Sequence, residues 1–226
     1  KSFKDKYDYQ EKIVMENITI KDIVEACSGQ LLCGDENKVI KEFSIDSRSG
    51  SEDSIFVPII GERVDAHKFI DGALKINGAT FTSEHDEPLE GFENKPWIRV
   101  LDNADFPYIA VESSLQAVKD IAEFYLKQLQ IPVVGITGSV GKTTTREMIS
   151  TVLASQKKVF QTIGNQNSQI GVPLTLSHLT REDEIAVLEI GMSERGQIEK
   201  LTNMIRPNVA VVTMIGVSHI AQLKTQ

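Results

Sequence analysis

The chain has 226 residues, 41% of them hydrophobic, which is enough for two ordinary globular domains. Its formal net charge of −8, from 24 basic and 32 acidic residues, argues against nucleic acid or an anionic membrane as the main partner. The sequence has only two cysteines, which excludes a disulfide scaffold and indicates the reducing cytoplasm. It has no apolar stretch of about 20 residues, which excludes a membrane span, and its N-terminus has no signal-peptide pattern.

The N-terminal part of the chain predicts a small α/β domain. Residues 1–14 are charged and mixed, and we interpret them as an extension in front of a domain at 15–104. Thr19 is suited to cap a helix that ends at Gly29, and a second helix is expected at 66–77. Strands are expected at 30–33, 39–45, 54–59, 79–82 and 97–100.

Residues 105–130 are expected to connect this domain to the next one. Ser113 is followed three residues later by Gln116, which resembles a capping box. Apolar residues then follow helical spacing as far as Leu129, and Pro132 marks the exit from this helix.

From residue 131 onward, strands and helices alternate. Strands whose residues are apolar throughout, placed between helices, predict a parallel sheet covered on both faces, and ligands of such sheets bind beyond the carboxyl ends of the strands. The expected fold class is therefore α/β, with a small first domain followed by a parallel-sheet domain at 131–226. Its strands are expected at 131–137, 158–162, 184–190 and 208–215, and its helices at 143–153, 173–179 and 196–205.

The most informative segment joins the first of these strands to its helix. Residues 134–145 read VGITGSVGKTTT, an apolar strand, a glycine-rich turn and a lysine followed by threonines. This pattern predicts a triphosphate site in which Lys142 lies along the β- and γ-phosphates and Thr143 coordinates Mg²⁺. Ile136 stands where the ordinary phosphate loop has its first glycine. The residues predicted to bind the nucleotide are Gly138, Ser139, Gly141, Lys142, Thr143 and Thr144.

Other polar residues are expected at the same edge of the sheet. Glu189 ends an apolar strand, where a carboxylate suits a hard cation, although a salt-bridged surface glutamate is the alternative. His219 follows the last strand; a lone histidine is usually structural, but this position favours the site. The amide-rich loop with Asn165 and Asn167 is either a plain turn or a ligand contact, and its position favours the contact.

Two polar turns follow strands of the first domain. The first holds Asp46, Ser47 and Arg48, and the second holds Gly61 and Arg63. Each is by itself an ordinary turn, although an arginine there can bind a phosphate or a carboxylate.

Taken together, these segments resemble the Mur ligase family of bacterial cell-wall synthesis. The loop at 135–145 is similar to that family's phosphate loop, including the displaced first glycine, although Val140 stands where many relatives have asparagine. The resemblance runs in order from about residue 15 to the end. Its further segments are 46–48, 56–69, 164–176, 187–191 and 215–219.

The resemblance implies an ATP-dependent ligase of peptidoglycan precursor synthesis. In the most similar member, ATP phosphorylates the carboxylate of UDP-N-acetylmuramoyl-tripeptide, and the amine of D-alanyl-D-alanine attacks the acyl phosphate to form an amide. The likeness implies ATP and Mg²⁺ as cofactors, and a monomer. It gives catalytic roles to Lys142, Glu189 and His219, and metal contacts to Thr143, Glu189 and His219. It gives substrate contacts to Asp46, Ser47, Arg48, Gly61, Arg63, Asn165 and Asn167.

Other functions remain open at this point. A sister ligase that adds a diamino acid or glutamate and a folylpolyglutamate synthase are related alternatives, and the Asp46–Arg48 turn argues against the folate enzyme. A non-catalytic ligase-like module fused to another enzyme is an alternative of a different class. The family's C-terminal domain is expected beyond Gln226, so we expect this chain not to complete the reaction alone.

Overall fold

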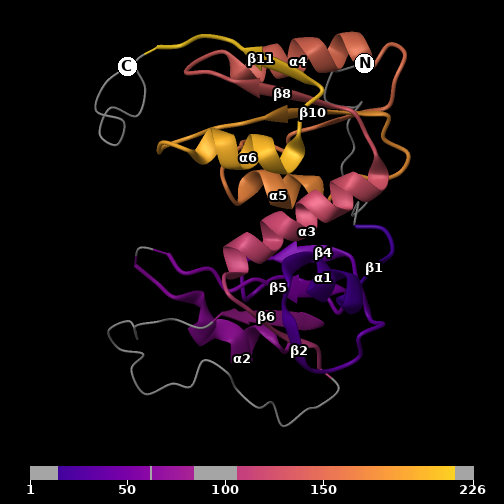
Figure 1. Ribbon diagram of the computed structural model, residues 1–226, viewed down its shortest axis with the longest axis vertical. Coiled ribbons are helices and arrows are strands. Elements are labelled where there is room, and N and C mark those ends of the chain that lie inside the picture. Colours follow the sequence, from indigo (N-terminus) through magenta and orange to yellow (C-terminus); the bar gives the residue numbers. More distant parts are fainter. Residues whose placement is uncertain (1–14, 62, 84–105, 217–226) are drawn as a thin grey trace.

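The computed structural model describes residues 15–61, 63–83 and 106–216. Two sheets lie one above the other along the long axis, and helix α3 (Ser114–Leu129) crosses between them (Figure 1). We refer to residues 15–111 as the N-terminal half and to residues 131–216 as the C-terminal half. The extension at 1–14, the strand expected at 97–100 and His219 lie outside the described residues.

The N-terminal half is built on a five-stranded sheet in the order β2-β7-β6-β5-β4, in which all neighbours are parallel except β2 and β7. A separate antiparallel pair joins β1 to β3. The strands are β1 (Ile18–Thr19), β2 (Gln30–Cys33), β3 (Val39–Ile40), β4 (Glu42–Ser44), β5 (Ser54–Phe56), β6 (Ala79–Ser83) and β7 (Tyr108–Val111).

Two strands of this half differ from the expectation. The segment at 39–45 is two strands, because β3 pairs with β1 while β4 pairs with β5, so one continuous strand cannot serve both partners. Strand β7 was not expected, and it lies between β2 and β6. The first sheet therefore extends beyond residue 104, into the segment expected only to connect the domains.

Helix α1 (Ile20–Cys27) and the 3₁₀ turn η2 (Ala66–Phe69) of this half begin where short polar side chains, Thr19 and Asp65, cap them. Helix α1 starts at a capping box, in which the amide of Asp22 donates to Thr19 Oγ1 at 3.2 Å and the Thr19 amide donates to Asp22 Oδ2 at 2.8 Å. Instead of one helix at 66–77, η2 is followed by α2 (Ile70–Ala73). Asn77 ends this segment because its side-chain amide donates to Ala73 O at 3.1 Å.

Helix α3 connects the two halves. Ser113 caps it by accepting from the Gln116 amide at 3.3 Å, but the Gln116 side chain donates to Asp120, so only half of the expected capping box forms. Tyr125, which is 1% exposed, donates its hydroxyl to Leu179 O at 2.7 Å and accepts from the Glu16 amide at 3.0 Å. One hydroxyl therefore joins α3 to both halves. No helix among the described residues is both long and apolar enough to cross a membrane.

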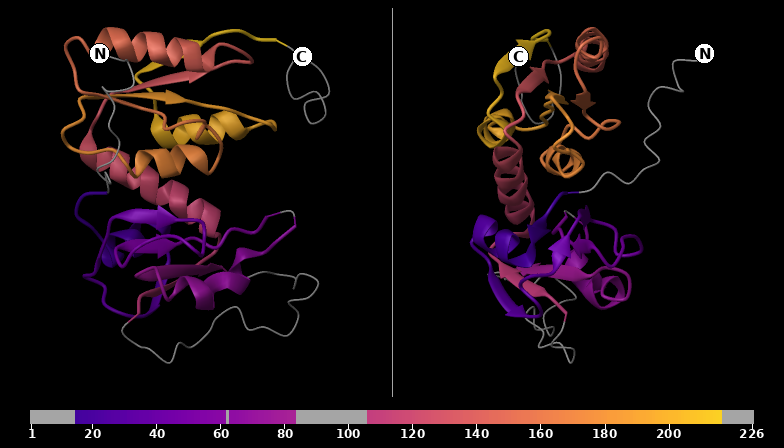
Figure 2. Two further views of the ribbon diagram at one scale, coloured as in Figure 1. Left: turned by 180° about the vertical axis from the view of Figure 1, so that it is seen from behind. Right: turned by 90° about the vertical axis from the view of Figure 1, so that its right-hand side faces the viewer.

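The C-terminal half is the predicted parallel sheet, in the order β11-β8-β10-β9. Helix α4 covers one face, and α5 and α6 lie on the other face beside α3 (Figures 1 and 2). The strands are β8 (Val133–Thr137), β9 (Val159–Gln161), β10 (Ile185–Glu189) and β11 (Val209–Val212). The helices are α4 (Lys142–Leu153), α5 (Gly171–Leu176) and α6 (Gln197–Ile205).

Alternation along the strands explains how both faces are buried. Val134, Ile136 and Val187 form a cluster with Ile149 and Leu153 of α4. Their neighbours along the strands belong to the larger cluster that also includes residues of α3, α5 and α6. The α/β fold class is thus confirmed, and every strand of this sheet ends at the same edge.

Candidate functional site

A cavity of about 540 Å³ opens at the carboxyl edge of the parallel sheet. Its lining comes from the loop after β8, the amide-rich loop after β9, the turn after β10 and the segment after β11. Among the lining residues are Gly138, Ser139, Lys142, Asn167, Gly191 and Gly216. Its location agrees with the general rule for ligand sites of parallel α/β sheets.

The loop between β8 and α4 can take its shape only with glycines at two positions. Gly138 has φ +136°, and a Cβ there would lie 2.2 Å from Thr213 Oγ1. Gly141 has φ +85° and stands at the start of α4, which no side chain of the described residues caps. The first-turn N–H groups of α4 are therefore suited to an anion.

Lys142 closes over this loop. Its Nζ donates to Gly138 O at 2.7 Å, and the residue lines the cavity. The ammonium group is thus bonded to the loop that the sequence pattern predicts to hold phosphates.

The segment after β11 anchors the loop from the side. Ser139 Oγ donates to Gly216 O at 2.9 Å and accepts from the Gly216 amide at 3.0 Å, while the Ser139 amide donates to Met214 O at 2.8 Å. Thr213 Oγ1 donates to Val140 O at 2.6 Å. The sequence analysis missed Thr213, because no local motif links it to a loop more than 70 residues earlier.

Glu189 and Thr143 meet at the end of β10. Thr143 Oγ1 donates to Glu189 Oε2 at 3.3 Å, and Glu189 is only 2% exposed. Its other oxygen, Oε1, lies 3.0 Å from Arg146 Nη1 in an ion pair. Glu189 is therefore salt-bridged but not a surface glutamate, and its carboxylate beside a hydroxyl is a donor set that Mg²⁺ prefers. Within the described residues no cluster of three His, Cys, Asp or Glu side chains could hold a metal.

Only part of the amide-rich loop reaches the cavity. Asn167 lines it and accepts from the Gly191 amide at 2.7 Å through its backbone carbonyl. Asn165 is exposed and is not part of this lining. Gln166 stabilises the loop by accepting from Thr175 Oγ1 at 2.9 Å.

A buried lysine that the sequence analysis also missed supports this loop. Lys119 of α3 is 9% exposed, and its Nζ donates to Gln169 Oε1 at 2.9 Å. Gln169 Nε2 in turn donates to Gln197 O at 2.9 Å, and Gln197 lines the cavity. Burial lowers the pKa of Lys119, and the nearby Lys200 charge adds to that effect.

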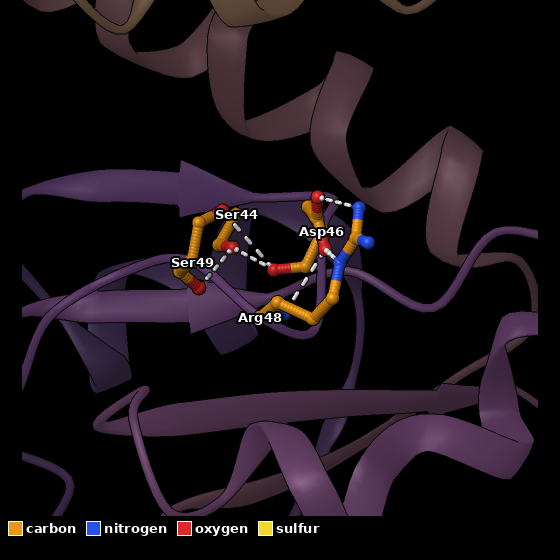
Figure 3. A network of polar contacts seen from close by, with 4 residues as sticks. All are labelled: Ser44, Asp46, Arg48 and Ser49. Atoms are coloured by element: carbon orange, nitrogen blue, oxygen red, sulfur yellow. Dashed lines mark hydrogen bonds and ion pairs between the residues drawn. The ribbon is translucent and has the colours of Figure 1, made fainter.

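The residues singled out in the first domain lie elsewhere. Arg48 and Asp46 form a two-pronged ion pair on the turn after β4, with Nε to Oδ1 at 2.9 Å and Nη2 to Oδ2 at 2.8 Å (Figure 3). Ser44 and Ser49 hydroxyls both bond to Asp46 O, at 3.0 and 3.2 Å, and fix the turn. Hydrogen bonds from the Arg48 side chain and backbone lower the pKa of Asp46 to about 2.

Ser47, Gly61 and Arg63 complete this group. Ser47 is half-buried in the same turn, while Gly61 and Arg63 are exposed in the loop after β5. The Gly61 amide donates to Val64 O at 2.9 Å, which closes that loop. None of these residues belongs to the lining of the 540 Å³ cavity, so the structure does not bring them to the nucleotide edge.

A buried array of Asp65, His67 and Ser83 holds the loop after β5. Asp65 Oδ1 lies 2.6 Å from His67 Nδ1, and the Ser83 amide donates to His67 Nε2 at 3.0 Å. Nε2 therefore accepts, and Nδ1 donates to Asp65. The order of residues resembles that of a hydrolase relay, but Nε2 already accepts a backbone N–H and all three residues are buried. We interpret the array as structural.

The parallel sheet, the phosphate-type loop and the cavity define an α/β protein built to bind a nucleotide. Residues 136–226 match the family model of the Mur ligase middle domain. The UDP-N-acetylmuramoyl-tripeptide–D-alanyl-D-alanine ligase of Bacillus subtilis is 38% identical over 206 residues, covering 91% of this chain and 42% of that protein. The ligase of the same name from Treponema pallidum is 36% identical, covering 81% and 39%.

Solved structures agree with these relatives. MurF from Acinetobacter baumannii matches with a TM-score of 0.77 and 26% identity, covering 93% of this chain and 44% of that one. The MurF ligase of Thermotoga maritima in complex with ADP matches with a TM-score of 0.67 and 32% identity, covering 79% and 38%. The chain belongs to the Mur ligase family, and it spans about two fifths of the length of these relatives.

Proposed function

We propose that this chain supplies the UDP-sugar-binding and ATP-binding parts of a cytoplasmic, monomeric ligase. The reaction joins D-alanyl-D-alanine to UDP-N-acetylmuramoyl-tripeptide through an acyl phosphate, in peptidoglycan precursor synthesis. The observation that carries the proposal is the convergence of Lys142, Thr143 and Glu189 at the start of α4, beside a cavity large enough for a ligand. The Bacillus subtilis relative, whose name describes this activity, aligns with 91% of the chain.

The residues of the loop divide the work of holding ATP. Backbone N–H groups around Gly138, Ser139 and Gly141 and the first turn of α4, with Thr144, would bind the phosphates. Lys142 would leave its present acceptor, Gly138 O, and donate to phosphate oxygens. Thr143 and Glu189 would hold Mg²⁺, which when bound offsets the charge of the transferred phosphoryl group. We include His219 in this site as a proposal from the family resemblance.

The N-terminal half would hold the UDP-sugar of the acceptor. Arg48 and Arg63 lie on exposed loops where a guanidinium group can reach a diphosphate, with Asp46, Ser47 and Gly61 beside them. Asn167 at the cavity, with Asn165 in the same loop, would face the part of the acceptor that reacts. Because β7 belongs to the first sheet, we propose a first domain at 15–111, with the middle domain from residue 131.

Phosphate release by a full-length protein that carries this chain tests the proposal. We expect release only when ATP, UDP-N-acetylmuramoyl-tripeptide and D-alanyl-D-alanine are all present. Lys142→Met should lower the rate at least about 100-fold, because one fixed charge on the transferring group is lost. Lys158→Met, which removes a half-exposed lysine paired with Glu182, is the matched control and should keep the rate. Turnover with glutamate or a diamino acid in place of the dipeptide would assign the chain to a sister ligase instead.

A further inference from the structure

Arg146 is a buried, charged residue beside the proposed ATP site, and the proposed function gives it no role. It lies in the second turn of α4 and is 6% exposed. Its Nη1 donates to Thr162 O at 3.0 Å and to Gly164 O at 3.2 Å, and lies 3.0 Å from Glu189 Oε1. Its Nη2 pairs with Glu147. One guanidinium group therefore contacts the end of β9, the start of the amide-rich loop and the tip of β10.

These contacts leave the two oxygens of Glu189 in different environments. Oε1 is buried, faces Arg146 and has no hydrogen bond of good geometry within the described residues. Oε2 accepts from Thr143 Oγ1 at 3.3 Å. The Glu189 amide donates to Thr162 Oγ1 at 2.7 Å, so Thr162 is bonded to both partners of the ion pair. The ion pair therefore sets which carboxylate oxygen points to the threonine of the phosphate loop.

The chemistry of the arginine side chain suits this position. A buried carboxylate without a counter-ion is costly, and the cost is offset only where geometry is well fixed. The planar guanidinium group can serve several acceptors at once, which the single ammonium of a lysine cannot do with the same directions. Removing the guanidinium group of Arg146 would free the Glu189 side chain to rotate towards other partners, and Oε2 would no longer be held against Thr143.

We infer that Arg146 is a positioning residue of the nucleotide site, holding Glu189 so that its Oε2 and the Thr143 hydroxyl together receive the cation that accompanies ATP. Through Thr162 O and Gly164 O the same side chain ties this carboxylate to the amide-rich loop. This inference rests on the proposed function. It gives Arg146 no contact with the nucleotide itself.

The test measures how strongly a divalent cation improves nucleotide binding to the 226-residue chain. ATP affinity is measured by calorimetry with Mg²⁺ and with a chelator, and Mn²⁺ binding to the ATP complex is followed by electron paramagnetic resonance. Arg146→Met should leave the affinity without metal within about twofold, because the phosphate loop is intact, but weaken Mn²⁺ binding roughly 10- to 100-fold. Glu189→Gln should do the same, and the double variant should add little to either single change.

Two further variants separate positioning from support of the fold. Arg206→Met removes an exposed arginine at the end of α6 and should behave like the unmodified chain. Arg146→Lys keeps the positive charge but lacks the planar guanidinium group. It should therefore fold normally, and its cation dependence should lie between that of Arg146→Met and that of the unmodified chain. Thermal unfolding of each variant reports whether the fold is kept, and Arg146→Lys carries the measurement if Arg146→Met does not fold.

Each outcome tests either the proposed function or the role of Arg146 alone. An unmodified chain that binds ATP no better with Mg²⁺ than without it would overturn the proposed function. A normal cation dependence in the unmodified chain that persists unchanged in Arg146→Met or Arg146→Lys would overturn the inference alone. Equal loss of affinity with and without metal would also overturn it, because that pattern indicates general support of the loop.

Discussion

The two halves of the molecule present their candidate ligand residues in different ways. In the C-terminal half, residues from the ends of β8, β10 and β11 meet around one cavity, and hydrogen bonds between Ser139, Thr213 and their partners hold the loop in place. In the N-terminal half, Arg48 and Arg63 lie on exposed loops, and Arg48 pairs with a neighbour on its own turn.

The difference does not follow from strand direction, because β4, β5, β6 and β7 of the N-terminal sheet are parallel as well. In the C-terminal half, hydrogen bonds join different loops to one another, from Ser139 to Gly216 and from Thr213 to Val140, and these bonds build the site before any ligand arrives. The backbone of the Arg48 turn is held in part from outside, by Asn77 Nδ2 donating to Ser49 O at 3.2 Å, but the Arg48 side chain itself is exposed, so a ligand has to organise it. The C-terminal site is thus preorganised, and binding there costs less ordering of side chains.

The largest expected effect comes from breaking the phosphate loop. Gly138→Ala places a Cβ 2.2 Å from Thr213 Oγ1 at a φ of +136°, so the loop has to move. We expect a destabilisation of roughly 1–3 kcal/mol and a loss of ATP affinity of about 100-fold. Calorimetric titration of ATP and urea unfolding measure the two quantities.

The control for this change lies in the other half. Gly34→Ala also has a positive φ, +96°, and its Cβ would lie 2.4 Å from Pro107. It should destabilise the chain to a similar extent but leave ATP affinity unchanged in the folded protein. Equal losses of affinity in both variants would show that the C-terminal site is not preorganised by its own loop.

A medium effect is expected where the two halves join. Tyr125→Phe removes the hydroxyl that bonds Leu179 O and the Glu16 amide, and should lower the free energy of unfolding by about 1–3 kcal/mol. Burial raises the pKa of Tyr125 to about 12, above its ordinary value near 10. Its contribution is therefore complete below pH 10 and is lost as the pH rises towards 12.

Urea unfolding of both proteins between pH 7 and pH 11.5 checks this expectation. The difference in stability between the unmodified chain and Tyr125→Phe should be constant up to pH 10 and shrink above it. A difference that is zero at pH 7, or that grows with pH, would contradict the role given to this hydroxyl.

The smallest effect is expected at the exposed ion pair. Arg48→Gln should raise the pKa of Asp46 from about 2 part of the way towards the ordinary value near 4, because the hydrogen bonds from the Arg48 side chain are lost while the one from the backbone amide of residue 48 remains. The stabilising effect of this pair is present above pH 4 and is lost as the pH falls towards 2. Titration of the carboxyl carbon by NMR measures the shift, and Lys41→Gln, which changes the pair with Asp53, should leave Asp46 unaffected. An unchanged pKa in Arg48→Gln would disprove the local pairing.

The sequence predicted the parts of the structure that local chemistry determines. The apolar segments and glycine turns located β8, β10 and α4 to within a few residues, because a buried parallel strand and a phosphate loop each have a strong local pattern. It did not predict β7, four residues whose place depends on partners in β2 and β6. The division between β3 and β4 has the same origin, since each pairs with a different strand.

The candidate site shows the same division. Lys142, Thr143 and Glu189 could be named from residue type and position at a strand end. The contacts of Thr213, Lys119 and Arg146 could not be predicted in this way, because each contact joins segments that are far apart in the sequence and meet only in the folded chain. The one available signal was a charged residue on the apolar side of a predicted helix, as at Lys119 and Arg146.

The contact between Lys142 Nζ and Gly138 O gives the phosphate-type loop its own internal acceptor. Phosphate binding is then an exchange reaction at this ammonium group, in which one oxygen acceptor replaces another. The lysine pays little for ordering its side chain when ATP arrives, and the enthalpy it contributes is the difference between two hydrogen bonds. The carbonyl of Gly138 thus competes with a phosphate oxygen for this ammonium group, which lowers the net affinity gained from Lys142 and favours release of a bound nucleotide.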